Sequence, residues 1–318
     1  DGPEAPMWRR AREEEVDNLI RHGAVEWVPE DSLSTWDWIK QQAWEVIDTL
    51  WVFKRKRDAQ GDVCRYKGRC TLRGDQQSAK ATQAGQELNS FAPTVRHSTF
   101  KLLNATGCIR RARKRTFDVE AAFLQGHRHD LPDVYCRPPP MSSGPPPTDD
   151  RGVPLVWKLR RPLYGSADAA RIWYQTLDEQ LISQGFTRSE YDPCYYYKVY
   201  DDGARTDMSI NVDDSWVSDT SGERCDAELA TLGKAFKLTV KEVPDAFLGM
   251  NLSFPDLSKI ELSNEAYLKK LAAEYLDKPL ESYRHELPAE RSLMDLYTAA
   301  SRVVPPRAPS RALAHGPL

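Results

Sequence analysis

The chain has few of the features that mark membrane proteins, secreted disulfide-rich proteins or structural metal sites. Its 318 residues contain no apolar run close to the ~18 residues that a membrane-spanning helix needs. The sequence begins without a basic stretch followed by an apolar one, so we expect no secretory leader. Its six cysteines are irregularly spaced and form no C-x-x-C pair, which favours reduced thiols. We therefore expect an intracellular protein that is not secreted and has no membrane partner.

Several common catalytic signatures are missing as well. The sequence has no H-E-x-x-H, no phosphate-binding glycine loop of the Walker type, no G-x-S-x-G and no internal repeat. A content of 40% hydrophobic and 29% charged residues is sufficient for a packed core of one large or two ordinary domains. The net charge of only −3 gives no overall sign of a nucleic-acid partner.

The hydrophobic pattern predicts a mixed helical and β-sheet protein. Residues 7–22 predict an amphipathic helix that ends at Gly23, and residues 50–56 and 63–72 predict a β-hairpin. From residue 115 to 262 the order is strand, helix, strand hairpin, helix, strand, which predicts a ferredoxin-like βαββαβ antiparallel sheet with helices on one face. Further expected helices cover 32–48, 167–184, 223–238 and 266–276, and further expected strands cover 115–119, 156–159, 194–200, 208–212, 247–254 and 260–262. We expect an N-terminal helical region at 1–49, a central domain at 50–280 and a flexible Pro/Ala/Arg-rich tail at 281–318.

Paired aspartates occur at three places, and only one pair lies inside a strand pattern. Asp149-Asp150 and Asp201-Asp202 lie in proline- or glycine-rich turns, which is typical of solvated turn residues. Asp213-Asp214 instead interrupts a strand-forming run without glycine, so a functional and a structural interpretation both stay open. Asp118 ends another strand candidate, where a lone aspartate is either a helix cap or a ligand.

The predicted sheet would bring these acids together. Its two central strands are the one that carries Asp118 and the hairpin that carries Asp213 and Asp214, so their carboxylates would face each other. Clustered carboxylates repel unless a cation lies between them, and Mg²⁺ is the ion expected for such hard oxygen ligands. Two such ions about 4 Å apart would activate a 3′-hydroxyl and stabilise a leaving pyrophosphate.

Positive charge is concentrated in two stretches near these acids. Residues 54–73 contain eight lysines and arginines against two aspartates, a local net charge of +6. Residues 110–115 add five more cations just before Asp118. Runs of one sign beside an acid cluster suit a polymerase, in which phosphates contact Lys and Arg while metals contact Asp.

Seven motifs in a fixed order carry a resemblance to a known family. They are Trp51-Val52-Phe53-Lys54, Arg65-Tyr66-Lys67-Gly68-Arg69 with Gly74 and Gln77, Phe91-Ala92-Pro93-Thr94-Val95-Arg96, Phe117-Asp118-Val119-Glu120-Ala121-Ala122-Phe123-Leu124-Gln125-Gly126, Leu163-Tyr164-Gly165 with Arg171 and Trp173, Val212-Asp213-Asp214, and Phe247-Leu248-Gly249. Together these stretches resemble the reverse transcriptase domain of Ty/copia-type LTR retrotransposons. They span about residues 50 to 275.

The resemblance implies a right-hand polymerase with fingers and palm, in which Asp118, Asp213 and Asp214 are the catalytic and metal-binding acids. It implies two Mg²⁺ ions, with Mn²⁺ as a substitute. The implied partners are an RNA or DNA template–primer, deoxynucleoside triphosphates and the other parts of a retrotransposon polyprotein. The implied location is a cytoplasmic particle or the nucleus.

The resemblance also assigns roles to residues around the acids. Candidate nucleotide-binding residues are Lys67, Arg69, Arg73, Val119, Phe123 and Gly165. Phe123 is similar to the steric gate that excludes a ribose 2′-OH, with an ordinary core residue as the alternative, and Gly165 to the glycine beneath the incoming nucleotide. The resemblance does not choose among the three cations for the triphosphate. Candidate primer-supporting residues are Phe247, Leu248 and Gly249.

The sequence also departs from the family pattern. Asn211 stands where Tyr is usual, and Ser166-Ala167-Asp168 stands where Leu-Lys-Gln is usual, which places an acid beside the expected nucleotide pocket. No RNase H acid cluster is recognisable after residue 280, so we expect the polymerase section of a polyprotein. These departures leave open a decayed or domesticated copy that binds nucleic acid without synthesis. A metal-dependent nuclease would share the paired carboxylates but would not need Phe123 or Gly165.

Overall fold

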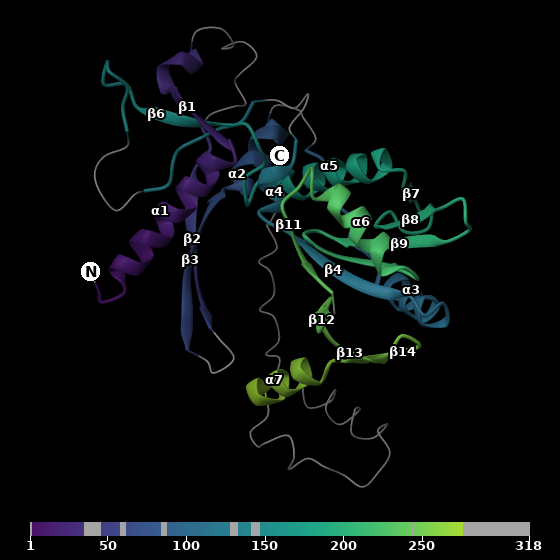
Figure 1. Ribbon diagram of the computed structural model, residues 1–318. Coiled ribbons are helices and arrows are strands. Elements are labelled where there is room, and N and C mark those ends of the chain that lie inside the picture. Colours follow the sequence, from purple (N-terminus) through teal and green to yellow (C-terminus); the bar gives the residue numbers. More distant parts are fainter. Residues whose placement is uncertain are drawn as a thin grey trace, which may run out of the picture. The chain divides into compact units, whose positions relative to one another are not determined.

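The computed structural model describes residues 2–34, 46–57, 62–83, 88–127, 133–140, 147–242 and 244–275. The tail expected at 281–318 and most of the helix expected at 32–48 lie outside these residues. By its internal contacts the chain divides into two units, residues 1–244 with 256–260, and residues 245–255 with 261–318. Figure 1 shows the elements of both units. No helix within the described ranges is both long and apolar enough to cross a membrane.

The hairpin expected between residues 50 and 72 is confirmed as β2 (Thr49–Arg57) and β3 (Val63–Leu72). Lys54 pairs with Lys67 in this antiparallel register, and Lys56 pairs with Arg65. Because side chains alternate between the two faces of a strand, these cations share one face of the hairpin. We call the side chains of Lys54, Lys56, Arg65, Lys67 and Arg69 the cationic face.

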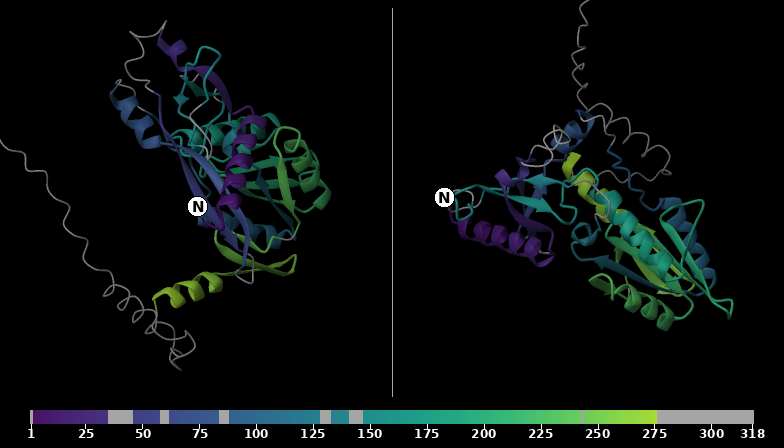
Figure 2. Two further views of the ribbon diagram at one scale, coloured as in Figure 1. Left: turned by 90° about the vertical axis from the view of Figure 1, so that its left-hand side faces the viewer. Right: turned by 90° about the horizontal axis from the view of Figure 1, so that it is seen from above.

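The opposite face of the hairpin is aromatic and packs against the first helix, α1 (Ala5–Arg21). The ring of Trp8 lies 5.1 Å from that of Phe53 and 4.7 Å from that of Tyr66, both edge-to-face. The left view of Figure 2 shows α1 lying beside the hairpin. The helix ends as predicted just before Gly23, whose φ of 57° is the left-handed conformation that glycine adopts without strain.

A second, three-stranded sheet continues this core. It has the strand order β1-β6-β5, with β1 at Val25–Pro29, β6 at Leu155–Leu159 and β5 at Tyr135–Cys136. One buried cluster joins α1, the hairpin and this sheet through Leu19, Cys70, Leu72, Trp157 and Leu159. The N-terminal helix therefore shares a core with the β2–β3 hairpin.

The largest sheet has six antiparallel strands in the order β11-β4-β10-β9-β8-β7. Their bounds are Leu238–Lys241 (β11), Arg113–Val119 (β4), Asp214–Asp219 (β10), Arg205–Asn211 (β9), Tyr195–Val199 (β8) and Thr187–Arg188 (β7). α3 (His97–Ile109) covers one face, where Phe100 meets Trp216 with 5.1 Å between ring centroids. α6 (Gly222–Leu232) covers the other face, where Asp226 pairs with Arg115 of β4.

The sequence prediction was wrong at one edge of this sheet. The helix expected at 223–238 ends at Leu232, with Gly233 as its C-cap, and the strand β11 that pairs with β4 begins only six residues later. Residues 247–254, expected as the edge strand, belong to the second unit instead. A four-residue edge strand has too weak a local pattern to predict, because the pairing with β4 decides its conformation.

Several short elements around the sheets were not predicted. They include η1 (Glu30–Ser34), α2 (Gly74–Gln83) and α4 (Ala122–Gln125), and the longer helix α3 was not predicted either. The helix expected at 167–184 is confirmed as α5 (Ala169–Ser183). Trp173 of α5 packs edge-to-face on Phe236, with 5.1 Å between the rings. This contact joins α5 to the segment that follows α6.

The second unit contains a small antiparallel sheet, β12 (Ala246–Phe247), β13 (Met250–Asp256) and β14 (Lys259–Ser263), and the helix α7 (Glu265–Tyr275). β12 and β13 are joined by the two-residue turn Leu248-Gly249. Both turn residues have positive φ, 50° and 74°, which is the geometry of the tight turns that suit twisted hairpins.

Candidate active site

The register of the central strands brings the predicted catalytic acids together. Asp118 of β4 pairs directly with Asp214 of β10. Directly opposite residues of an antiparallel pair point to the same side, with Cβ atoms about 5 Å apart. Asp213 lies in the two-residue turn between Asn211 of β9 and Asp214. Three carboxylates therefore lie together where two neighbouring central strands end. We call Asp118, Asp213 and Asp214 the acid edge.

These acids are electrostatically coupled. Partial burial raises the pKa of Asp118, and the charge of Asp213 raises it further. Burial, followed by the charges of Asp118 and Asp213, raises the pKa of Asp214 to about 6. Within the described residues, no three Asp, Glu, His or Cys side chains are placed so that they could hold a metal ion as they stand. The three carboxylates are therefore a mutually repelling group that a cation would stabilise, provided that their side chains turn toward it.

Two hydrogen bonds hold the turn that carries Asp213. The carbonyl of Val212 accepts from the indole N–H of Trp173, at 2.6 Å. The carbonyl of Asp213 accepts from the backbone N–H of Val119, at 3.0 Å. Val119, which follows Asp118 and is buried, therefore contacts the turn that carries Asp213 through its backbone N–H. The turn is fixed both by the neighbouring strand and by α5.

The structure places Lys67, Arg69 and Arg73, the three candidate triphosphate-binding cations, in different surroundings. The charges of Lys56 and Lys67 oppose the rise in the pKa of Asp118, so these two lysines of the cationic face lie near enough to act on the acids. Burial lowers the pKa of Lys67 itself. The guanidinium of Arg69 lies 5.0 Å from the ring centroid of Tyr164. Arg73 instead forms an ion pair of 2.8 Å with Asp75.

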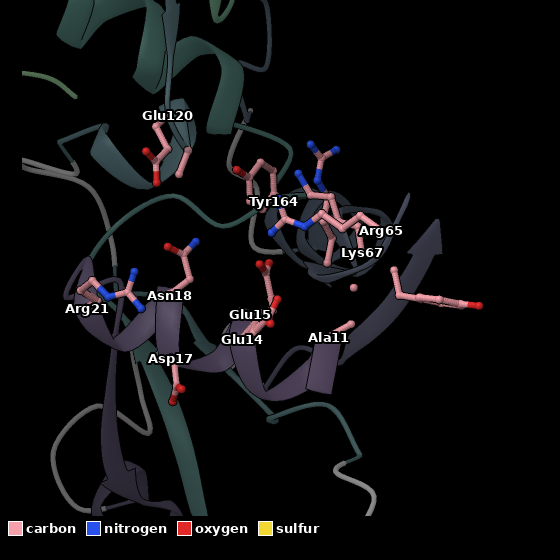
Figure 3. A pocket seen from close by; sticks show the side chains of 14 residues that line it. Ala11, Glu14, Glu15, Asp17, Asn18, Arg21, Arg65, Lys67, Glu120 and Tyr164 are labelled. Atoms are coloured by element: carbon pink, nitrogen blue, oxygen red, sulfur yellow. The ribbon is translucent and has the colours of Figure 1, made fainter. Parts of the chain in front are cut away.

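A cleft of about 530 Å³ lies between α1 and β3, next to these cations. Figure 3 shows Glu15 and Asn18 pointing into it from α1, with Tyr164 across from them. Burial raises the pKa of Glu15, whose carboxylate accepts a hydrogen bond of 3.2 Å from the Cys70 N–H. Lys67 also lines the cleft. The role of Glu15 in this cleft could not be predicted, because α1 has only the sequence pattern of an ordinary amphipathic helix.

Phe123 lies on α4, beyond the strand that ends in Asp118 and Val119. Its half-buried ring is tilted against that of Tyr164, with 5.6 Å between centroids. The aromatic side chain is therefore backed by a second ring, on which Arg69 lies from another side. Sequence reasoning missed Tyr164, although it stands in a quoted motif.

Gly165 is required by the protein's own backbone. Its φ is 83°, and a Cβ there would lie 2.3 Å from the Leu72 carbonyl oxygen of β3. The neighbouring Asp168, expected beside the nucleotide pocket, is only 2% exposed and accepts a hydrogen bond from Gln77 of α2. This acid therefore joins α5 to α2.

The predicted primer-supporting residues form the β12–β13 turn of the second unit. Phe247 is buried, while Leu248 and Gly249 make the turn itself. Leu248 has a left-handed φ of 50°, which costs energy for a residue other than glycine. Leu248 and Gly249 therefore form a tight turn between two short strands.

Comparison with known sequences decides the family. A family profile described as reverse transcriptase (RNA-dependent DNA polymerase) matches residues 34–277, well over half of the chain. The chain belongs to the reverse transcriptase family. This match confirms the family predicted from the seven motifs.

The relatives of this reverse transcriptase domain are retrotransposon proteins. The Pol polyprotein from transposon TNT 1-94 of Nicotiana tabacum is 24% identical over 85% of this chain and 19% of its own length. The Pol polyprotein from transposon RE1 of Arabidopsis thaliana is 28% identical over 84% of this chain and 17% of its own length. A putative transposon Ty5-1 protein of Saccharomyces cerevisiae is 28% identical over 49% of this chain and 48% of its own length. The predicted Ty/copia-type origin is confirmed, and the chain spans less than a fifth of the two plant polyproteins.

One solved structure matches the chain at a low level. It is a telomerase from Candida albicans in complex with a fragment of telomeric RNA, with a TM-score of 0.41 and 11% sequence identity. The superposition covers 85% of this chain and 54% of the telomerase chain. A similarity at this level supports no statement about residues.

Proposed function

We propose that this chain is the polymerase part of a retrotransposon polyprotein and adds deoxynucleotides to a primer 3′ end on an RNA or DNA template. One observation carries the proposal: Asp118 and Asp214 are register partners, with Asp213 in the adjoining turn, and the charges of Lys56 and Lys67 act on Asp118. Acids for metals and cations for phosphates then occupy one site. The partners proposed are a template–primer and deoxynucleoside triphosphates, in a cytoplasmic particle or the nucleus.

We assign the metal site to Asp118, Asp213 and Asp214. Their donor chemistry fits Mg²⁺, since hard carboxylate oxygens that raise one another's pKa are stabilised by a hard cation. When bound, two Mg²⁺ ions would supply charge neutralisation for the attacking 3′-oxygen and the leaving pyrophosphate. Mn²⁺ has the same oxygen preference and is the proposed substitute.

The chain's own residues would position the substrates around these acids. Lys67 is our choice for the triphosphate, because its charge reaches Asp118 while Arg73 is paired with Asp75. Phe123, backed by Tyr164, would exclude a ribose 2′-OH. Phe247, Leu248 and Gly249 would support the primer. Phosphoryl transfer demands little covalent chemistry of a protein, so positioning of this kind is its main contribution.

We also propose that the six-stranded sheet is the palm with a ferredoxin-like core. The order β11-β4-β10-β9 supports this, because the first and last strands of a βαββαβ unit then lie next to each other. In this assignment the β9–β10 hairpin is the central one, with the acids in its turn. The β2–β3 hairpin belongs to the fingers.

The test is primer extension on poly-rA/oligo-dT with Mg²⁺, comparing wild type with Asp213→Asn. We expect the rate to fall by about 10³-fold or more, as for removal of a group that acts as part of a catalytic unit. Asp201→Asn is the matched control, because Asp201 also belongs to an Asp-Asp pair in a hairpin turn but lies far along the sheet from the acids. It should extend primers at the wild-type rate. Incorporation that persists in Asp213→Asn contradicts the catalytic assignment.

The alternative functions give different results in the same assay. A decayed or domesticated copy would bind template–primer without extending it in any variant. Asn211, beside the acid turn, is the observation that favours this alternative, whereas Asp168 no longer does because it is buried against α2. A metal-dependent nuclease would shorten the primer instead.

A further inference from the structure

The turn that carries Asp213 has an unfavourable backbone conformation. Val212 has a φ of 60°, in the left-handed region that L-residues avoid. For a β-branched side chain this is an outlier, since the branched Cβ crowds the adjacent carbonyl. Such a conformation is strained and persists only where the surrounding structure holds it. Something must therefore hold the peptide after Val212 in place.

The indole N–H of Trp173 supplies that hold. It donates to the Val212 carbonyl at 2.6 Å, from a side chain that is only 1% exposed. The indole is itself fixed, because its ring packs edge-to-face on Phe236. A buried, oriented donor on a helix thus determines the direction of the peptide that joins Val212 to Asp213.

The second carbonyl of the turn, that of Asp213, is hydrogen-bonded by β4 and not by α5. The Val119 N–H donates to the Asp213 carbonyl at 3.0 Å, so the neighbouring strand fixes the second peptide. Neither bond touches a carboxylate, yet together they determine where the Cα of Asp213 lies relative to Asp118. The strand bond is part of the sheet, while the bond from Trp173 depends on one side chain.

We propose that Trp173 is a positioning residue of the active site, which holds Val212 in its left-handed conformation and thereby places Asp213 beside the Asp118–Asp214 pair. This inference rests on the proposed polymerase function for its effect on rate. Its structural part does not, since the hydrogen bond and the turn can be measured without catalysis. An ordinary core tryptophan would contribute packing alone.

The test is Trp173→Phe in the full chain, which keeps an aromatic ring toward Phe236 but removes the donor. We expect kcat in primer extension to fall about tenfold, because small misplacements of a reacting group reduce rates by one to two orders of magnitude. The KM for deoxynucleotide and the template–primer Kd should stay within about twofold, since those contacts are not made by the turn. Tyr174→Phe is the matched control: it also removes a donor from α5 to a backbone carbonyl, that of Pro193, and should leave kcat unchanged.

Amide and indole hydrogen exchange, measured by NMR, tests the same inference without activity. In the wild type we expect slow exchange of the Trp173 indole N–H, identified as the indole signal lost in Trp173→Phe. Amides of residues 212–214 should exchange faster in Trp173→Phe than in Tyr174→Phe, because a local opening raises exchange.

Rapid exchange of the wild-type indole N–H, or unchanged amide exchange at residues 212–214, overturns the proposal. So does a Trp173→Phe loss that appears equally in kcat, KM and Kd, which is the signature of general unfolding. A wild type that does not extend primers contradicts the polymerase proposal, while the exchange results still decide the role of Trp173 in the turn.

Discussion

The β2–β3 hairpin and the β4–β10 strand pair place opposite charges at one site in two different ways. The acids lie at strand ends and in a turn in the middle of a six-stranded sheet, where backbone pairing fixes their spacing. The cations lie along a two-stranded ribbon, where only the alternation of side chains brings them to one face. An isolated ribbon of two strands is marginally stable, so the cationic face depends on what covers its other side.

That support comes from α1. Glu4 binds Arg55 at 2.6 Å and accepts a hydrogen bond of 3.0 Å from the Tyr66 hydroxyl. The helix backbone passes so close to Gly68 that a Cβ there would lie 3.1 Å from the Ala11 carbonyl oxygen. The cation on the covered face, Arg55, is paired with Glu4 at the start of α1, while Lys67 on the cationic face lines the cleft beside α1. The acid edge is therefore fixed by its own sheet, whereas the cationic face is fixed by the packing of a separate helix.

Replacing single lysines of the cationic face tests whether one of them, or only the total charge, binds the deoxynucleotide. In Lys67→Ala we expect the KM for deoxynucleotide to rise on the order of 30-fold, because a charge-assisted contact to phosphate contributes about 1.5–3 kcal/mol. Lys54→Ala is the matched control, since Lys54 is the register partner of Lys67 on the same face but is not among the largest influences on the pKa of Asp118. Its KM should change less than about threefold, as for an exposed cation. Steady-state primer extension measures both values, and equal effects of the two variants would show that the face acts only through its total charge.

We expect a smaller effect from replacing Phe123, the proposed steric gate. In Phe123→Ala we expect use of ribonucleotides relative to deoxynucleotides to rise about tenfold, a range typical of removing a steric contact from a pocket. The reason is that the ring, held against Tyr164, would no longer occupy the space of a 2′-OH. Competitive incorporation of ribo- and deoxynucleotides measures this ratio. Discrimination equal to that of the wild type would assign Phe123 to the core.

Sequence reasoning could predict that the three acids lie together, but not what supports them. Asp118 and Asp214 stand at the ends of strand patterns, so the predicted sheet was sufficient to make them neighbours. The role of Trp173 could not be predicted, because a tryptophan on an amphipathic helix has the same pattern whether its N–H is used or not. Likewise, Lys67 and Arg73 are both cations of one strand segment, and only the hairpin register and the Asp75 ion pair separate them.

The position of β11 shows the same limit at the level of the fold. Leu238–Lys241 is too short for a distinct strand pattern, and its conformation follows from the free edge of β4. The burial of Asp168 is also a tertiary effect, since Gln77 comes from a helix that is distant in the sequence. Local pattern therefore predicted the elements that have their own periodicity, and failed where a partner determines the residue's environment.

The smallest predicted effect concerns the stability of the acid edge. The folded-state pKa of Asp214 is about 6, above its ordinary value of 3.8, so the folded protein binds this proton more tightly than the unfolded chain. Stability from this group is then present at acidic pH and is lost as pH rises through about 6. At pH 7.5 without metal ions, Asp214→Asn should therefore raise the free energy of unfolding by about 1 kcal/mol, after discounting ~1.4 kcal/mol per pKa unit for partial exposure.

Thermal melting in EDTA at two pH values measures this effect. The gain of Asp214→Asn over the wild type should be present at pH 7.5 and vanish near pH 4, where the wild-type carboxyl is already protonated. Asp202→Asn is the control with the opposite sign, because the Ala204 N–H and Arg224 lower the pKa of that exposed turn carboxylate. It should not raise the melting temperature at either pH. A lower melting temperature for Asp214→Asn at pH 7.5 would mean that the acid edge is stabilised by its carboxylates, and the contrast with the helix-supported cationic face would disappear.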